Sequence, residues 1–372
     1  IMERIDVAKN NMSIDRIEEK CINCGSCDKI CAFKKELLNH EEPLIFGAVN
    51  KNLDILNSSA SGGAFAALAQ WAFDNGGIVF GCAWNQNMVA SIIQINSMDN
   101  LYKIQGSKYV QSQMDGIYES VEKILKKGRL VLFSGTPCQC DSLRSYLKYD
   151  YENLICVELI CHGVPNTKMF KEYLNVLEKK WKCHIIDVHF RDKKSGWGAL
   201  LRIDFIDKNN RHKVKYLKPG ESSYYYYFFE KSMFFRPSCY SCKYACSTRI
   251  SDFTIGDFWG GEKICKGEKS ENGLSVIMFN TEKSKKRLLE VSKYMRLYET
   301  SIDFVKHENG QIDKPSKKNE QYDVLLKQYS ERGAEVFESE FREKNKKLII
   351  ISKIKRSIPV NIKKEIISII KK

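Results

Sequence analysis

Hydrophobic residues in the middle of the chain form short runs that are separated by polar turns and helical patterns. Residues 78–84, 129–134 and 154–161 are nearly continuous apolar runs, which predict buried strands. The last two runs each pass through a glycine turn into a helical pattern, and a strand that turns into a helix is the repeating unit of a parallel sheet. Further strands are predicted for 89–95, 185–190, 199–206 and 213–217. The pattern therefore predicts an α/β fold.

Four cysteines near the N-terminus have a spacing typical of bacterial ferredoxins. Cys21, Cys24, Cys27 and Cys31 form a C-x2-C-x2-C-x3-C run, by which such proteins hold a 4Fe–4S cluster. Three thiolates must reach three corners of one cluster, and Gly25 suits the tight curl that this requires. Cys31 either completes this cluster or binds a neighbouring one. A zinc site and buried free thiols are the alternatives, but structural zinc sites usually combine paired CxxC units.

Four further cysteines are candidates for a second cluster. Cys138 and Cys161 each follow a predicted strand, at the carboxyl end where parallel sheets bind their ligands. Cys239 and Cys242 form a CxxC, which can grip a metal or act as a redox dithiol. We expect these four thiols to hold a second cluster, with Cys246 in reserve and more than four irons per chain. The remaining cysteines are interpreted as ordinary thiols: Cys82, Cys140, Cys156, Cys183 and Cys265.

A Ser/Gly cluster at residues 57–63 runs directly into an Ala-rich helical pattern. Free N–H groups and the helix dipole at such a start bind anions, typically phosphate. Ser61 offers a hydroxyl donor, and Gly62 and Gly63 would let a pyrophosphate approach the backbone. An ordinary serine N-cap is the alternative interpretation.

Composition and charge narrow the class of protein. The 372 residues are 43% hydrophobic, which allows a sizeable core, and no apolar run is long enough to span a membrane. Lys and Arg outnumber Asp and Glu by 60 to 46, and residues 341–372 alone hold eleven Lys/Arg against two Asp/Glu. This excess lies in a tail without a recognition module, so no nucleic-acid partner is expected. A basic amphipathic tail can contact a membrane surface, although a docked or solvated helix explains it more simply.

The cysteines and the charge pattern divide the chain into three predicted parts. Fourteen cysteines without a recognisable signal peptide favour a cytoplasmic protein with metal-bound thiolates over a disulfide-rich secreted one. Residues 1–45 are expected to form a small ferredoxin-like 4Fe–4S unit, which the metal helps to fold. Residues 46–280 are expected to form a mixed α/β domain, and residues 281–372 a helical, basic C-terminal region.

Several stretches, taken together, resemble the coenzyme F420 hydrogenase/dehydrogenase beta-subunit family. They are 21–31, 58–65, 106–112, 135–139, 161–165, 236–242 and 252–260, in the family's order over about two thirds of the chain. The resemblance implies an iron–sulfur flavoprotein that binds FAD beside a 4Fe–4S cluster. Such proteins pass electrons between the cluster and a hydride carrier, which is coenzyme F420 in the founding members. It also implies that Ser61, Gly62 and Gly63 bind phosphate and that Lys108 and Thr136 lie near the flavin.

Three functions agree with these motifs. The first is an oxidoreductase in which FAD links a small-molecule hydride carrier or substrate to the cluster, because clusters move one electron and hydride carriers move two. The second is a non-enzymatic iron–sulfur subunit of a larger complex. The third is a zinc-stabilised binding protein. The expected partners are an electron-transfer protein or complex subunit and a small-molecule hydride carrier. No general acid is assigned, since His162 suits proton transfer and a structural role equally well.

Overall fold

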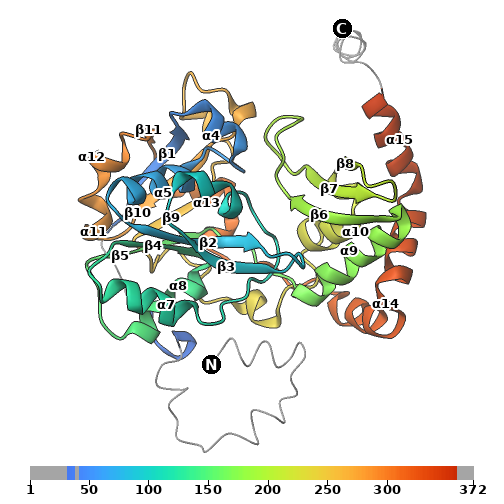
Figure 1. Cartoon of the computed structure of the whole chain (residues 1–372), viewed down its shortest axis with the longest axis horizontal. Helices are drawn as coiled ribbons and strands as arrows, with labels where there is room; N and C mark the ends of the chain where they lie inside the picture. Colours follow the sequence, from blue (N-terminus) through green and yellow to red (C-terminus); the bar gives the residue numbers. More distant parts are fainter. Residues whose placement is uncertain (1–31, 38–41, 358–372) are drawn as a thin grey trace, which may run out of the picture.

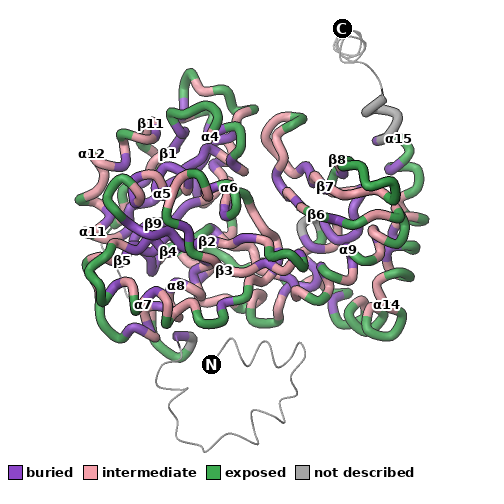
Figure 2. Tube along the Cα trace, viewed as in Figure 1, coloured by how far each residue is buried: buried purple, intermediate pink, exposed green. Residues whose placement is uncertain are grey.

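The computed structural model describes residues 32–37 and 42–357, and its centre is an eight-stranded mixed sheet. The strand order is β11-β1-β10-β9-β5-β4-β2-β3, and a separate three-stranded sheet, β6-β7-β8, lies beside it (Figure 1). Buried residues concentrate along the large sheet (Figure 2). The predicted α/β class is confirmed, with the addition that the sheet is mixed.

The large sheet is built from the apolar runs of the sequence. Its strands are β1 (Leu44–Asn50), β2 (Ile78–Trp84), β3 (Ala90–Ile95), β4 (Val131–Gly135), β5 (Leu154–Leu159), β9 (Phe253–Asp257), β10 (Ser275–Phe279) and β11 (Met295–Glu299). The central strands β2, β4, β5 and β9 are parallel, as the strand–turn–helix pattern predicted. β3, which corresponds to the strand predicted at 89–95, pairs antiparallel with β2. The antiparallel strands β1, β10 and β11 complete the other edge.

Helices connect the strands of the large sheet and pack against it. They are α4 (Leu53–Ser58), α5 (Ala64–Asp74), α6 (Leu101–Ile104), α7 (Ile117–Leu125), α8 (Pro137–Leu147), α11 (Glu282–Lys285), α12 (Leu288–Val291) and α13 (Ile302–Glu308). In α5, seven of eleven residues are buried, and five of those seven are alanine. Such small side chains allow α5 to lie close against the sheet, and its start at Ala64 agrees with the predicted Ser/Gly-to-helix junction.

The smaller sheet forms a second packing unit with an aromatic core. Its strands β6 (Cys183–His189), β7 (Leu201–Asp207) and β8 (His212–Leu217) pack with α9 (Thr167–Trp181), α10 (Ser223–Tyr225) and α14 (Tyr322–Lys344). Tyr225 and Phe228 are buried here, so these aromatic side chains form part of the core. Trp84, at the end of β2, stacks on Phe170 of α9 at 5.1 Å and joins this unit to the large sheet.

The region beyond residue 281 is mostly helical, as predicted. Its described part ends in α14 and α15 (Lys346–Ser357), which lie on the side of the small sheet away from the large one (Figure 1). It also contributes the edge strand β11, which the charged sequence pattern did not reveal. Among the described residues, no helix combines the length and apolar character that crossing a membrane requires.

Gly62 provides a test of how tightly the α4–α5 connection packs on the sheet. A Cβ added here would lie 2.3 Å from the Ala48 carbonyl oxygen and 2.4 Å from the Ser275 nitrogen. Because two strand backbones would have to move, we expect Gly62→Ala to lower the free energy of unfolding by about 2–3 kcal/mol. Denaturant unfolding measures this change. Gly310→Ala is the matched control, since its added Cβ has no atom within 4 Å, and equal losses in both variants would contradict the prediction.

Candidate functional site

A cavity of about 310 Å³ lies at the carboxyl ends of the parallel strands. Its wall includes Gly135 after β4, Ile160 after β5 and Asp257 at the end of β9. Open α/β sheets bind their ligands at this edge, because the strand-to-helix turns converge there. The cavity is therefore the candidate site, and both predicted strand–turn–helix units contribute to it.

The N-terminal end of α5 opens onto this cavity. Gly63 precedes the helix with a φ of 80°, and Gly63, Ala64, Phe65 and Ala66 all line the cavity. Within the described chain, no side chain caps this end of α5. The N–H groups of the first helical turn have no partner within the helix, so they and the helix dipole favour an anion here.

The N-terminal end of α8 reaches the same cavity but is already capped. The Thr136 nitrogen donates to Oε1 of Gln139 at 3.0 Å, which forms part of a capping box. The Thr136 hydroxyl lies 3.1 Å from Sγ of Cys138. Thr136, Cys138 and Gln139 all line the cavity. This helix thus presents side chains to a ligand, whereas α5 presents its backbone.

The predicted cofactor residues are gathered at the cavity, with one exception. Ser61, Gly63, Lys108 and Thr136 line it, while Gly62 is packed between β1 and β10. The Ser61 hydroxyl donates to the Leu274 carbonyl at 2.6 Å, so a structural bond occupies its proton. Their roles in phosphate or flavin binding stay predictions.

Lys108 is wrapped by the backbone of its own loop. Its ammonium group donates to the carbonyls of Gln105 at 2.8 Å and Gly106 at 3.2 Å. Burial lowers the pKa of this ammonium group, and Cys82, which also lines the cavity, lies close enough to oppose that effect. Lys108 therefore shapes the wall of the cavity in addition to placing a positive charge beside it.

Lys193 is a residue of this region that the sequence did not single out. It lies in the β6–β7 loop and donates to the carbonyls of Leu56 at 2.6 Å, Ser61 at 2.7 Å and Asn272 at 2.5 Å. Burial lowers the pKa of Lys193 to about 8. The lysine joins the small sheet to the Ser/Gly connection. Its only sequence signal is a charged triplet between two strands.

A second group that the sequence did not identify borders the cavity. Arg191 is buried and donates to Asp257 at 2.6 Å and to the Tyr109 hydroxyl at 3.1 Å, and it lies against the ring of Trp259. Asp257 and Tyr109 line the cavity. Burial raises the pKa of Tyr109, so its hydroxyl keeps its proton near neutral pH. His162 also lines the cavity, and burial lowers the pKa of its imidazole.

The structure brings the four predicted second-cluster cysteines into one neighbourhood. Cys239 lies in η5 (Pro237–Ser241) and Cys242 directly follows it, while Cys138 lies in the first turn of α8 and Cys161 comes two residues after β5. Burial raises the pKa of Cys138 to about 12 and that of Cys161 still further, and the nearby thiols contribute to both shifts. Free thiols here would thus stay protonated, and a metal would have to displace their protons.

A metal centre requires several ligating side chains grouped around one point. In residues 32–37 and 42–357, no three His, Cys, Asp or Glu side chains are close enough together to hold a metal ion. The thiol-only donor set does fit the soft ligands that iron–sulfur clusters require. The second cluster stays a prediction, and Cys21, Cys24, Cys27 and Cys31 lie outside the described residues.

A buried ion pair anchors the CxxC loop to the sheet. Glu158 of β5 is fully buried and is paired with Arg249, which is 4% exposed. Arg249 also donates to the carbonyls of Tyr244 at 3.2 Å and Cys246 at 3.1 Å. These bonds hold the loop that carries Cys239 and Cys242 in a defined position beside β5.

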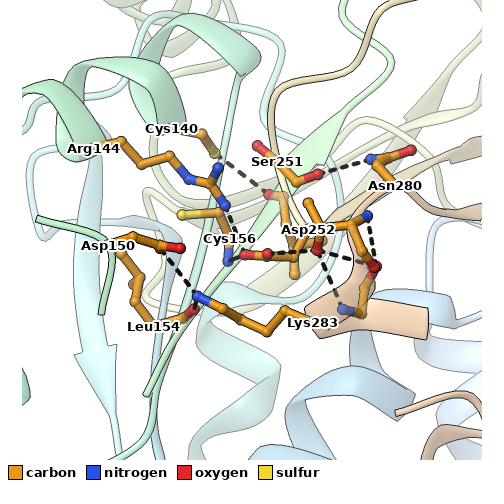
Figure 3. A network of polar contacts seen from close by, with 12 residues as sticks. Cys140, Arg144, Asp150, Leu154, Cys156, Ser251, Asp252, Asn280 and Lys283 are labelled. Carbon is orange, nitrogen blue, oxygen red and sulfur yellow. Dashed lines mark hydrogen bonds and ion pairs between the residues drawn. The ribbon is translucent and has the colours of Figure 1, made fainter. Parts of the chain in front are cut away.

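A second buried carboxylate positions α8. One oxygen of Asp252 accepts hydrogen bonds from Arg144 of α8 at 2.9 Å and from the Cys156 nitrogen of β5 at 2.8 Å (Figure 3). Its other oxygen accepts from the Thr281 hydroxyl at 2.9 Å. The C-terminal half of α8 is therefore held against β5 and the start of β9, whereas Cys138 lies in the first turn of the same helix.

The Glu158–Arg249 pair allows a direct test of this anchoring. Glu158→Gln would leave the Arg249 charge buried without its counterion, so we expect a loss of about 3–5 kcal/mol in the free energy of unfolding. We also expect a lower iron content after anaerobic purification. Denaturant titration and iron analysis measure the two effects. Glu122→Gln, which breaks the exposed pair with Lys126, is the control and should cost less than about 1 kcal/mol. A stable Glu158→Gln variant would show that the pair is dispensable.

Comparison with known proteins found a family model that matches the central part of the chain. Residues 128–303 match the family model that describes the C terminus of the beta subunit of coenzyme F420 hydrogenase/dehydrogenase. One similar solved chain comes from the F420-reducing [NiFe] hydrogenase complex of Methanosarcina barkeri. It has 15% sequence identity and a TM-score of 0.46, over 80% of this chain and 93% of that chain. The search of curated proteins found no match.

Proposed function

Because its residues 128–303 match the model of the coenzyme F420 hydrogenase/dehydrogenase beta-subunit family, we propose that this chain is an electron-transfer subunit with oxidoreductase activity, an iron–sulfur flavoprotein. The observation that carries the proposal is the cavity, which is lined by both the uncapped end of α5 and the half-buried Cys138. FAD bound there would supply the conversion between hydride transfer and single-electron transfer.

The residues of the cavity suit a dinucleotide at two points. The backbone N–H groups at the start of α5, at Ala64 and Phe65, would hold its phosphates, because the helix dipole stabilises negative charge there. Lys108 and Thr136 would lie beside the same ligand. The Tyr109 hydroxyl, which also lines the cavity, is held by Arg191 and would orient the ring system or its hydride partner.

The cysteines supply two sets of thiolate ligands. We propose that Cys21, Cys24, Cys27 and Cys31 hold one 4Fe–4S cluster. A second cluster would be held by Cys138, Cys161, Cys239 and Cys242. Because Cys138 is shared between this set and the cavity wall, the second cluster would adjoin the flavin. The hydride partner is coenzyme F420 or another small hydride carrier. A subunit without flavin, which acts only as an electron carrier, is the competing function.

Cofactor analysis separates these functions. The protein purified without oxygen should contain about eight irons and one FAD per chain, with a brown absorbance that dithionite bleaches. Iron without flavin would favour the carrier function, and zinc in a colourless protein would contradict both. The double variant Cys239→Ser/Cys242→Ser should lose about four irons and keep the others. The matched control, Cys183→Ser at the start of β6, should keep the wild-type iron content.

The phosphate site has its own test at Ala60, a half-buried residue that lines the cavity before α5. Ala60→Asp would place a carboxylate beside the pyrophosphate, so we expect the dissociation constant for FAD to rise about tenfold or more. The free protein should lose no thermal stability, because negative charge near a helix N-terminus is favourable. Fluorescence titration of the flavin-free protein measures the affinity. Ala60→Ser is the control, and equal affinity in both variants would place the phosphates elsewhere.

A further inference from the structure

A lysine-lined groove lies beside the CxxC loop and has no part in the proposed function. Its volume is about 570 Å³, and it is bordered by η4 (Tyr226–Glu230), residues 317–321 and the end of α14. Lys231, Lys317, Lys318 and Lys344 line it, whereas Glu320 is the single acidic residue among its lining residues in the described chain. All four lysines are exposed. Lys318 pairs with Asp323 at 2.9 Å, so the groove is open to solvent and owes its positive charge to the other three lysines.

Two tyrosines connect this groove to Cys239. Tyr240, which follows Cys239, donates its hydroxyl to the carbonyl of Ser232 in the groove at 2.8 Å. The buried Tyr322 packs edge-on against Tyr240, with ring centroids 5.4 Å apart, and Lys318 lies over the Tyr322 ring at 4.5 Å. A single layer of aromatic side chains therefore separates the lysines from the CxxC loop.

The CxxC loop also reaches the surface. Pro237, Ser238 and Ser241 are exposed, while Cys239 and Cys242 between them are only partly covered. Cys138, which lies near both thiols of this loop, lines the cavity. An electron entering near Cys239 would therefore have a short route toward the cavity.

We propose that this groove is the docking site of an acidic one-electron carrier protein, which exchanges electrons with the centre at Cys239. The inference rests on the proposed function, since it requires a redox centre held by the CxxC. In each transfer one electron leaves the reduced carrier and enters that centre, and no bond forms or breaks. Redox encounters use small interfaces in which complementary charge supplies orientation and association rate.

The distribution of charge favours a protein over a lipid surface. The four lysines come from three separate segments and border a concave surface, which suits protruding carboxylates. Membrane insertion needs exposed apolar side chains among the basic ones. Large apolar side chains of this kind are exposed on α15, at Leu348, Ile350 and Ile351, outside the groove lining.

The test uses the full chain with its iron and flavin, and an acidic two-cluster ferredoxin as the probe. In Lys317→Glu/Lys344→Glu, we expect the dissociation constant of the complex at low salt to rise about tenfold or more, because two attractive charges become repulsive. The dependence of binding on salt should become weaker. Biolayer interferometry without oxygen measures the binding. Stopped-flow reduction should slow in parallel, while reduction by dithionite stays unchanged.

Lys123→Glu/Lys127→Glu is the matched control. These exposed lysines lie at or just after the end of α7, which is at the opposite end of the molecule from α14 in Figure 1, and the charge change is the same. The control should bind the ferredoxin within about twofold of the wild type. Equal loss in both variants would overturn the docking site. Unchanged ferredoxin binding in the groove variant would also overturn the docking site. This holds whether or not that variant loses binding to vesicles of phosphatidylglycerol and phosphatidylcholine. A chain without iron would instead overturn the proposed function and, with it, this inference.

Discussion

Two buried carboxylates, Glu158 and Asp252, hold together the part of the sheet on which the site is built. Each is paired with an arginine, Arg249 and Arg144 respectively. Burying a charge costs free energy that the ion pair only partly recovers, so the main effect of such pairs here is to fix position. The Glu158–Arg249 pair fixes the position of the CxxC loop. The Asp252–Arg144 pair fixes the position of α8, which carries Cys138 in its first turn. The distances between the candidate thiol ligands therefore depend on these two ion pairs.

The electrostatics of the cavity divide it into two regions. The free end of α5 and the ammonium group of Lys108 lie along one part, which favours an anion. Elsewhere in the lining, the charge of Asp257 is neutralised by Arg191, which also donates a hydrogen bond to the Tyr109 hydroxyl. A ligand with phosphates at one end and a ring system at the other matches this division.

Much of the framework followed from local pattern. The apolar runs at 129–134 and 154–161 correspond to β4 and β5, and the Ser/Gly cluster led into α5 as expected. The edge strand β11 was missed, because an edge strand with one polar face has no strong apolar run. Gly62 was assigned to phosphate, but its contacts with Ala48 and Ser275 show that close backbone packing alone requires a glycine there.

The sequence by itself determined the spacing of the cysteines, the parallel strand–turn–helix units and the starts of their helices. These features depend on residues a few positions apart, whose geometry is set by the covalent chain and by hydrophobic periodicity. Only the tertiary structure decided that Lys193 meets the Ser61 carbonyl, that Arg191 meets Asp257 and that Tyr322 of α14 packs against Tyr240 beside Cys239. Such contacts join segments far apart in the chain, and they arise from how whole elements pack, which no local spacing encodes.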